Sequence, residues 1–194
     1  MQIEPITLEG QFIRLEPLTL EHHAGLCEVG LNEALWRWTT NLIRTPEDMK
    51  LHIDEALAAQ AAGTAVPFAT VEKATGRAIG STRFGNIDRA HRRAEIGWTW
   101  LGLNWQRTAA NTEAKLLMLR HAFETWGCHR VEFKTDSLNE ISRRALLRIG
   151  AKEEGVLRNH MLTYSGRLRH SVYFSIIDSE WPGVEAELIR RLRR

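Results

Sequence analysis

The chain has 194 residues, of which 43% are hydrophobic and 26% charged, a composition typical of one globular domain with a sizeable core. A net charge of +2 at pH 7, with the basic residues scattered along the chain, does not favour a dedicated nucleic-acid binder. Two distant cysteines argue against a disulfide scaffold; with no apolar run of about 20 residues and no signal-peptide pattern, we expect a cytoplasmic protein without a membrane anchor.

The first half of the chain predicts a strand, two helices and three further strands. Residues 12–18 alternate apolar and polar side chains, which is typical of a strand. Thr19 is a candidate cap for a helix that reaches about Val29. A second helix begins at the TPED run of residues 45–48, which places a cap, a proline and two acids in order, and it ends at Gly63. Strands are then expected at residues 67–72, 78–87 and 94–101.

The second half continues the same mixed pattern. A polar loop at residues 106–111 leads into a helix over residues 112–125. Asn139 is the expected cap of another helix, which ends at Gly150. Strands are predicted at residues 131–135, 155–164 and 168–177, followed by a basic amphipathic helix at residues 184–194. Without a linker or an internal repeat, this order predicts a single mixed α/β (α+β) domain over residues 1–194.

The junction between the strand at residues 94–101 and the helix at residues 112–125 is the clearest candidate ligand site. The first N–H groups of a helix have no partner inside it, and the macrodipole adds about half a positive charge there. Arg107 adds a full charge, while Ala109 and Ala110 let a phosphate approach the backbone. These features predict a site for the pyrophosphate of a nucleotide-containing cofactor. The alternative is an ordinary polar loop that binds nothing.

Two separated blocks carry a resemblance to a known family. QRTAAN at residues 106–111 resembles the acetyl-CoA loop of the GNAT superfamily of N-acetyltransferases. KTDSLNEISRRAL at residues 134–146 looks like a segment of the Rim-type branch, whose members acetylate the α-amino groups of ribosomal proteins. The run IGAKEEGVLR at residues 149–158 and a last strand that closes near Trp181 are similar to the continuation of that branch, so the resemblance covers nearly the whole chain.

The resemblance implies a GNAT fold, with a mixed, mostly antiparallel twisted sheet of about seven strands flanked by helices. It also implies direct transfer of an acetyl group from acetyl-CoA to a primary amine. A peptide N-terminus, a polyamine, an amino acid and an antibiotic amine all remain open as acceptors. The chain departs from the family pattern at Ala109, where glycine is usual, at Asn111, which we expect to cap the helix, and at Ala151, which replaces a core aromatic.

The same resemblance assigns residues to coenzyme A. The expected cofactor-binding residues are Gly97, Trp98, Thr99, Trp100, Leu101, Gln106, Arg107, Thr108, Ala109, Ala110, Asn111, Thr112, Asn139, Ser142 and Arg143. The tyrosine that acts as general acid in many members is absent, because Leu146 takes its place. Ser142 is therefore the candidate that protonates or stabilises the leaving thiolate; the alternative is a serine that only bonds to the first turn of its helix.

Glu95 is the leading candidate for the general base that takes the proton of the amine. An ion pair with Arg92, Arg93 or another neighbour is an equally open interpretation of this carboxylate. His91 is a weaker alternative base.

The acceptor pocket is expected near Trp36, Trp38 and His91, although core packing is the favoured interpretation of the two tryptophans. The eight histidines show no metal-ligand spacing. A catalytically weak acyl-CoA-binding or regulatory protein is the main rival interpretation. A nucleic-acid module that uses the arginines of residues 190–194 is a second rival that we do not expect. A homodimer is compatible with the resemblance.

Overall fold

The computed structural model describes Met1 and residues 3–193, and it is organised around one eight-stranded sheet with the strand order β1-β2-β3-β4-β5-β6-β8-β7. The strands are β1 (Leu8–Glu9), β2 (Ile13–Pro17), β3 (Val66–Glu72), β4 (Ala78–Asp88), β5 (Arg93–Leu101), β6 (Arg130–Asp136), β7 (Lys152–Leu162) and β8 (Leu168–Ile177). All neighbours are antiparallel except β5 and β6, which run parallel and are joined by a helical crossover.

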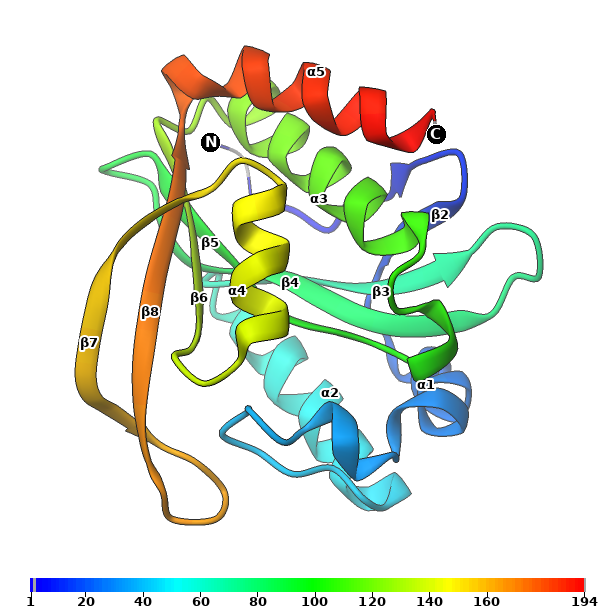
Figure 1. The fold of residues 1–194 in the computed structure, drawn as a ribbon. Helices are drawn as coiled ribbons and strands as arrows, with labels where there is room; N and C mark the ends of the chain where they lie inside the picture. Colours follow the sequence, from blue (N-terminus) through cyan, green and yellow to red (C-terminus); the bar gives the residue numbers. More distant parts are fainter. Residues whose placement is uncertain (2, 194) are drawn as a thin grey trace.

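Helices cover both faces of this sheet (Figure 1). They are α1 (His23–Gly30), α2 (Pro46–Ala61), α3 (Ala109–Arg120), α4 (Glu140–Arg148) and α5 (Trp181–Leu192). The larger core cluster joins the sheet to α3, α4 and α5, and the smaller one joins it to α1 and α2. Neighbouring residues of one strand, such as Trp100 and Leu101, belong to different clusters, as alternation requires. We call the two sides the α3 face and the α2 face.

Local sequence explains where α2 begins. The hydroxyl of Thr45 accepts the N–H of Asp48 at 3.1 Å, and the carboxylate of Asp48 accepts the N–H of Thr45 at 3.0 Å. Pro46 follows as the first helical residue. This is the reciprocal capping box that the TPED run predicts.

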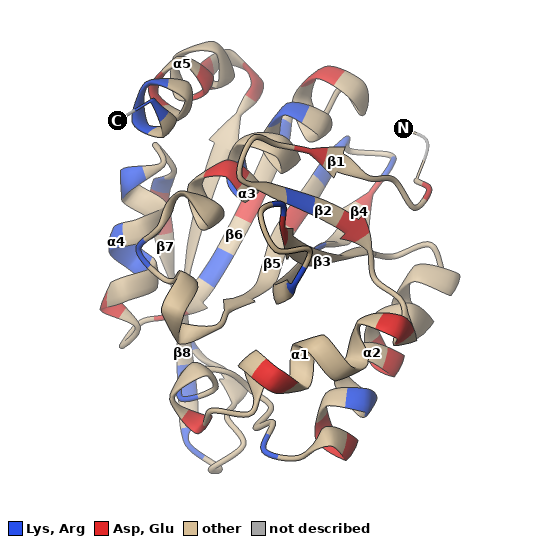
Figure 2. Cartoon of the chain, turned by 90° about the vertical axis from the view of Figure 1, so that its right-hand side faces the viewer, with Lys and Arg blue, Asp and Glu red and all other residues tan. Residues whose placement is uncertain are grey.

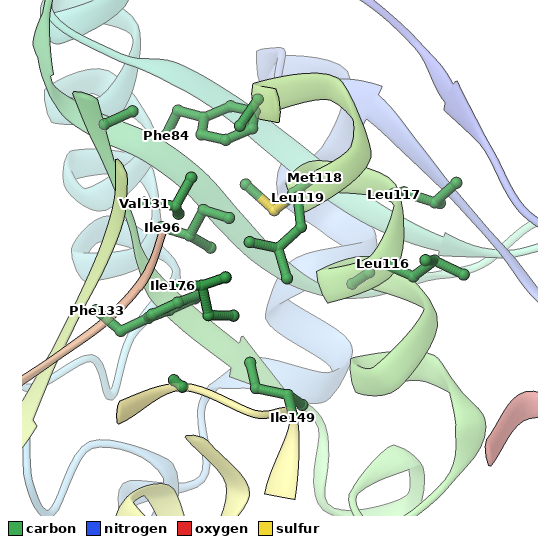
Figure 3. Packing of buried hydrophobic residues seen from close by; sticks show 14 of the residues in the cluster. Phe84, Ile96, Leu116, Leu117, Met118, Leu119, Val131, Phe133, Ile149 and Ile176 are labelled. Atoms are coloured by element: carbon green, nitrogen blue, oxygen red, sulfur yellow. The ribbon is translucent and has the colours of Figure 1, made fainter. Parts of the chain in front are cut away.

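α3 is the central element of the α3 face, because residues 113–119 are all buried. Figure 3 shows Met118 and Leu119 of this helix packed among side chains of β4, β5 and β6. The helix continues into one π-helical turn, His121–Thr125. There His121 packs against the rings of Phe84 and Trp126, and burial lowers its pKa, so it is a core residue.

The predicted mixed fold is confirmed, with two corrections. The sheet has eight strands rather than about seven, because β1 pairs with β2 through only two residue pairs and shows no alternation in the sequence. α3 begins at Ala109, three residues before the expected start. The C-terminal helix is present as α5, although Arg194 lies outside the described residues. Within the described part of the chain, no helix is both long and apolar enough to cross a membrane.

Candidate functional site

β5 and β6 form a fork. Their parallel ladder has only three pairs, the last of which joins Glu95 to Glu132, and beyond it the strands separate. β5 also carries a bulge, because Arg83 of β4 pairs with Gly97 while Ser81 pairs with Trp100. Trp98 sits in this bulge with φ of 50°. The fork, which we define as residues 97–101 of β5 and 134–136 of β6, therefore presents strand edges that do not pair with one another.

In the chain, α3 lies between β5 and β6, the two strands of the fork, and its N-terminus follows β5. Thr108 is its cap, and its hydroxyl accepts the N–H of Ala110 at 3.2 Å. Asn111, which we expected to cap the helix, lies inside the first turn, and its side-chain oxygen is buried without a partner. The cap lies three residues earlier because Thr108 has the same capping chemistry.

The loop position where glycine is usual, Ala109, carries no backbone strain, and the strained residue is its neighbour but one. Ala109 is helical, whereas Arg107 adopts φ of 62°, a region that favours glycine. The Arg107 guanidinium is exposed and pairs with none of the described residues. Gln106 donates to the carbonyl of Leu101 at 3.2 Å. An uncompensated cation beside the open N–H groups of the first helical turn fits an anionic ligand. Thr112 lies one turn in, where a helical N–H bonds to the carbonyl four residues earlier.

The N-terminus of α4 carries the second predicted block. Asn139 caps α4 by accepting the N–H of Ser142 at 3.1 Å, and its amide NH₂ forms no hydrogen bond with the described residues. The hydroxyl of Ser142 is half-buried and has no partner among residues 1 and 3–193. Arg143 pairs with Glu153 at 3.2 Å and donates to the carbonyl of Ser137 at 3.3 Å, and its role toward coenzyme A stays a prediction. Leu146, in the tyrosine position, packs in the core.

Lys115 of α3 was missed by the sequence reasoning. Its side chain is only 4% exposed, and its ammonium donates to the hydroxyl of Thr99 on β5 at 2.8 Å. The same ammonium lies 5.9 Å from the ring centre of Phe133 on β6. It therefore bridges the two strands beside the fork. Burial lowers its pKa to about 7. The only signal in the sequence is a lysine within an otherwise apolar helical run.

Glu95 lies on the α2 face, beside the point where the ladder ends. It is 2% exposed, forms an ion pair with Lys134 at 3.2 Å and accepts a hydrogen bond from Asn86 at 2.8 Å. The ion pair that we considered is present, but with a partner on β6 rather than with Arg92 or Arg93. A carboxylate held in this way can still accept a proton from an amine, since each oxygen has a second lone pair.

A pocket of about 810 Å³ opens beside Glu95 on the α2 face. Its lining residues are Asn86, Ile87, Asp88, Arg89, Ala90, Arg93, Glu95, Glu132, Leu157 and Tyr173. His91 is exposed at the tip of the β4–β5 hairpin, and only its neighbours line the pocket. The pocket therefore exposes the carboxylate of Glu95 on the side of the fork opposite α3.

The two tryptophans differ in their surroundings. Trp36 is 3% exposed and donates its indole N–H to Gly30, so it belongs to the core, as the favoured interpretation had it, and does not line this pocket. Trp38 is half-buried, and the guanidinium groups of Arg37 and Arg167 lie 4.7 and 5.8 Å from its ring centre. Among the predicted acceptor residues, Trp38 thus comes closest to the β7–β8 hairpin.

Comparison with known proteins adds independent findings. The family model described as "Acetyltransferase (GNAT) domain" matches residues 13–152. The chain is 33% identical over 109 residues to a putative ribosomal N-acetyltransferase, YdaF, of Bacillus subtilis; the match covers 56% of this chain and 58% of the relative's length, so it spans somewhat more than half of that relative.

Solved structures of other proteins match nearly the whole chain. A GCN5-related N-acetyltransferase from Brucella melitensis has 32% identity and a TM-score of 0.90, over 97% of this chain and 86% of that one. Mycobacterium smegmatis RimJ in complex with CoA-disulfide has 23% identity and a TM-score of 0.82, over 96% and 95% of the two chains, and that likeness concerns the fold alone.

Proposed function

Since the chain belongs to the GNAT acetyltransferase family, we propose that it transfers an acetyl group from acetyl-CoA, which enzymes of this family use, to a primary amine. The observation that carries this proposal is the fork between β5 and β6. Unpaired strand edges and two capped helix starts, those of α3 and α4, accompany it. A carboxylate that could take the proton of the amine lies at its closed end.

The residues present fit coenzyme A. The pyrophosphate would be held by the N–H groups at the start of α3 together with Arg107, which has no competing ion pair among the described residues. The buried, unpartnered oxygen of Asn111 and the free NH₂ of Asn139 offer one acceptor and one donor for the remaining polar groups of the ligand. When bound, acetyl-CoA would supply the activated acetyl thioester.

The proton chemistry is assigned to three side chains. Glu95 accepts the proton that the attacking amine must lose. Ser142 keeps a free hydroxyl to protonate or stabilise the departing thiolate. Lys115, whose pKa of about 7 leaves a large protonated fraction at neutral pH, adds a second donor near the fork.

Transfer is proposed to be direct, without an acetyl-enzyme. Cys128 is buried in the core and burial raises its pKa to about 11, so it is a poor nucleophile. Cys27 lies in the other core cluster, and burial raises its pKa as well.

A protein or peptide N-terminus is the acceptor favoured by the Rim-type resemblance and by the name of the Bacillus subtilis relative. Small amines remain the alternative, because the pocket beside Glu95 is open to solvent and has no shape that demands a peptide. We place the protein in the cytoplasm, where acetyl-CoA is available, and treat residues 1–194 as one domain.

The decisive experiment measures thiol release from acetyl-CoA in the presence of a panel of peptide N-termini and small amines, together with calorimetric binding of CoA. We expect CoA to bind and at least one amine to be acetylated. CoA binding without thiol release for any amine would support the rival, a catalytically weak acyl-CoA-binding protein. Absence of CoA binding would contradict both.

A further inference from the structure

Two arginines on the α2 face are buried without a counter-charge. Arg83 of β4 is 6% exposed and Arg169 of β8 is 8% exposed. The Nε–H of each is buried and has no hydrogen-bond partner in the described part of the chain. Neither guanidinium forms an ion pair within residues 1 and 3–193. Within the same residues, the one hydrogen bond of either guanidinium is a weak one of 3.5 Å from Arg169 to the carbonyl of Trp38.

Strand register places both arginines on the same face of the sheet as Glu95. Arg83 is opposite Gly97 in the β4–β5 ladder, and its guanidinium lies 4.9 Å from the ring centre of Trp98. Lys134, the partner of Glu95, lies 5.8 Å from the same ring. Lys134 is opposite Tyr173 on β8. Arg169 lies four residues before Tyr173 on the same strand, so the two side chains are on the same face.

The buried carboxylates near these two arginines already have other partners. Glu95 is neutralised by Lys134, and the buried carboxylate of Asp136 is neutralised by Arg167. Glu55 raises the pKa of Arg83, and Asp136 raises that of Arg169. In both cases burial lowers the pKa by more. The α2 face between Trp98 and the β7–β8 hairpin thus holds two buried arginines that form no ion pair with the described residues. Figure 2 shows basic positions on β6 and β8 in this part of the sheet.

Other unpaired polar atoms share this region. The hydroxyl of Ser171, two residues from Arg169 and on the same face, is buried without a partner. So is Nδ1 of His160, whose ring lies 5.8 Å from that of Tyr173. Buried donors without acceptors cost stability, and a cluster of them beside these two arginines points to a ligand that supplies negative oxygen atoms.

We propose that the acetyl acceptor carries a carboxylate as well as its amine, with the amine at Glu95 and the carboxylate bound by Arg83 and Arg169. This inference rests on the proposed acetyl transfer and names the substrate class of that site. A planar carboxylate suits the guanidinium group, which can donate from Nε and from a terminal nitrogen to its two oxygens. Acidic peptides and amino acids fit this description, whereas polyamines and aminoglycosides do not.

The first test compares acceptors that differ only in charge. 4-Aminobutyrate is paired with 4-aminobutanamide, and the peptide amide Ala-Glu-NH₂ with Ala-Gln-NH₂. We expect kcat/KM to be at least about tenfold higher for the acid in one pair or both, the size of a charged hydrogen bond in a desolvated site. Equal acetylation within both pairs would overturn this inference and leave the proposed function intact. If no amine is acetylated, the proposed function itself fails.

A third acceptor distinguishes the anion. 2-Aminoethyl phosphate has a similar length but carries a phosphate. We expect it to react more slowly than 4-aminobutyrate. A faster reaction would show that the two arginines bind a phosphate rather than a carboxylate, and would overturn the assignment.

The second test uses Arg83→Met and Arg169→Met. We expect each variant to lose most of the preference for acids, chiefly through KM, and to bind glutarate more weakly in an equilibrium measurement that needs no turnover. Their Tm is expected to stay equal or to rise, because a buried unpaired charge is removed. Arg190→Met, at an exposed arginine that pairs with Glu187, is the matched control and should retain the preference. A lower Tm with an unchanged preference would assign both arginines to stability and overturn the proposal.

Discussion

α3 buries two charged side chains only two residues apart, and their surroundings differ. Glu113 is 4% exposed and accepts three backbone N–H groups, those of residues 11–13, at 2.6, 2.8 and 2.8 Å. Lys115 is equally buried but donates only to the hydroxyl of Thr99. A carboxylate with three donors fixes structure, whereas an ammonium left with unused donors costs stability and is expected where chemistry takes place.

The turn between β1 and β2 is shaped to receive Glu113. A Cβ added at Gly10 would lie 2.4 Å from the carboxyl carbon of Glu113, so no larger residue fits there without a shift. No comparable arrangement surrounds Lys115, which faces Thr99 and the ring of Phe133 instead. The difference separates a buried charge that anchors the N-terminal strands from one that is available to a ligand in the fork.

The largest expected effect is on stability, from Glu113→Gln. An amide keeps one acceptor oxygen but turns an NH₂ toward the backbone N–H groups of the turn. We expect the free energy of unfolding to fall by about 3 kcal/mol. Urea denaturation measures this, with Glu185→Gln, at the half-exposed partner of Arg120, as the control that should lose under about 1 kcal/mol. An equal loss of stability in both variants would show that Glu113 stabilises the fold no more than an ordinary surface ion pair does.

Glu95→Gln is expected to affect the reaction more than the fold. Losing a general base typically slows turnover by about a hundredfold or more, and the glutamine retains the shape of the side chain. Steady-state kinetics with an acceptor amine measures this loss. Glu154→Gln, at a carboxylate that pairs with Arg130 and does not line the pocket, is the control and should change kcat less than about threefold. A wild-type kcat in Glu95→Gln would assign Glu95 to its ion pair with Lys134 alone.

Lys115→Met tests the other half of the comparison. We expect turnover to fall about tenfold through the loss of a cation near the fork. Stability at pH 7 should hold or rise, because Met avoids burying an ammonium. A loss of several kcal/mol would show instead that Lys115 is structural, like Glu113.

The pH dependence of that stability has a definite sign. The folded-state pKa of Lys115 is about 7, below its unfolded value of about 10.4. Between these values the unfolded chain binds the extra proton, so wild-type stability rises with pH across this window relative to Lys115→Met. Denaturation at pH 6, 8 and 10 measures the gap between the two proteins, which should favour Met most at pH 6. A constant gap would contradict the shifted pKa.

The sequence predicted the elements that have strong local signals. The start of α2 follows from Thr45 and Pro46, and the cap of α4 at Asn139 follows from its side chain. It could not identify Lys115 as buried, since a lysine on a helix normally indicates a solvated face. Arg83 and Arg169 were missed for a related reason: the bulge at Trp98 and the open hairpin decide which strand positions are enclosed, and both depend on tertiary structure.

At the start of α3, the sequence predicted the helix but not the strained backbone of the loop before it. The QRTAAN motif located the loop, but the family pattern drew attention to Ala109, whereas the left-handed residue is Arg107. Ala109→Gly is therefore expected to leave CoA affinity within about twofold, because a helical alanine has no strain to release.

Substitutions of Arg107 give the sharpest separation of charge from strain. Arg107→Gly removes the charge and the cost of φ at 62°, so stability should rise by up to about 1 kcal/mol while CoA binds several-fold more weakly. Arg107→Ala removes the charge and keeps the strain, so affinity should fall equally without any gain in stability. Calorimetric titration with CoA and urea denaturation measure the two quantities. If both variants bind CoA as the wild type does, the start of α3 holds the ligand through its backbone alone, and the unpaired guanidinium beside it has another role.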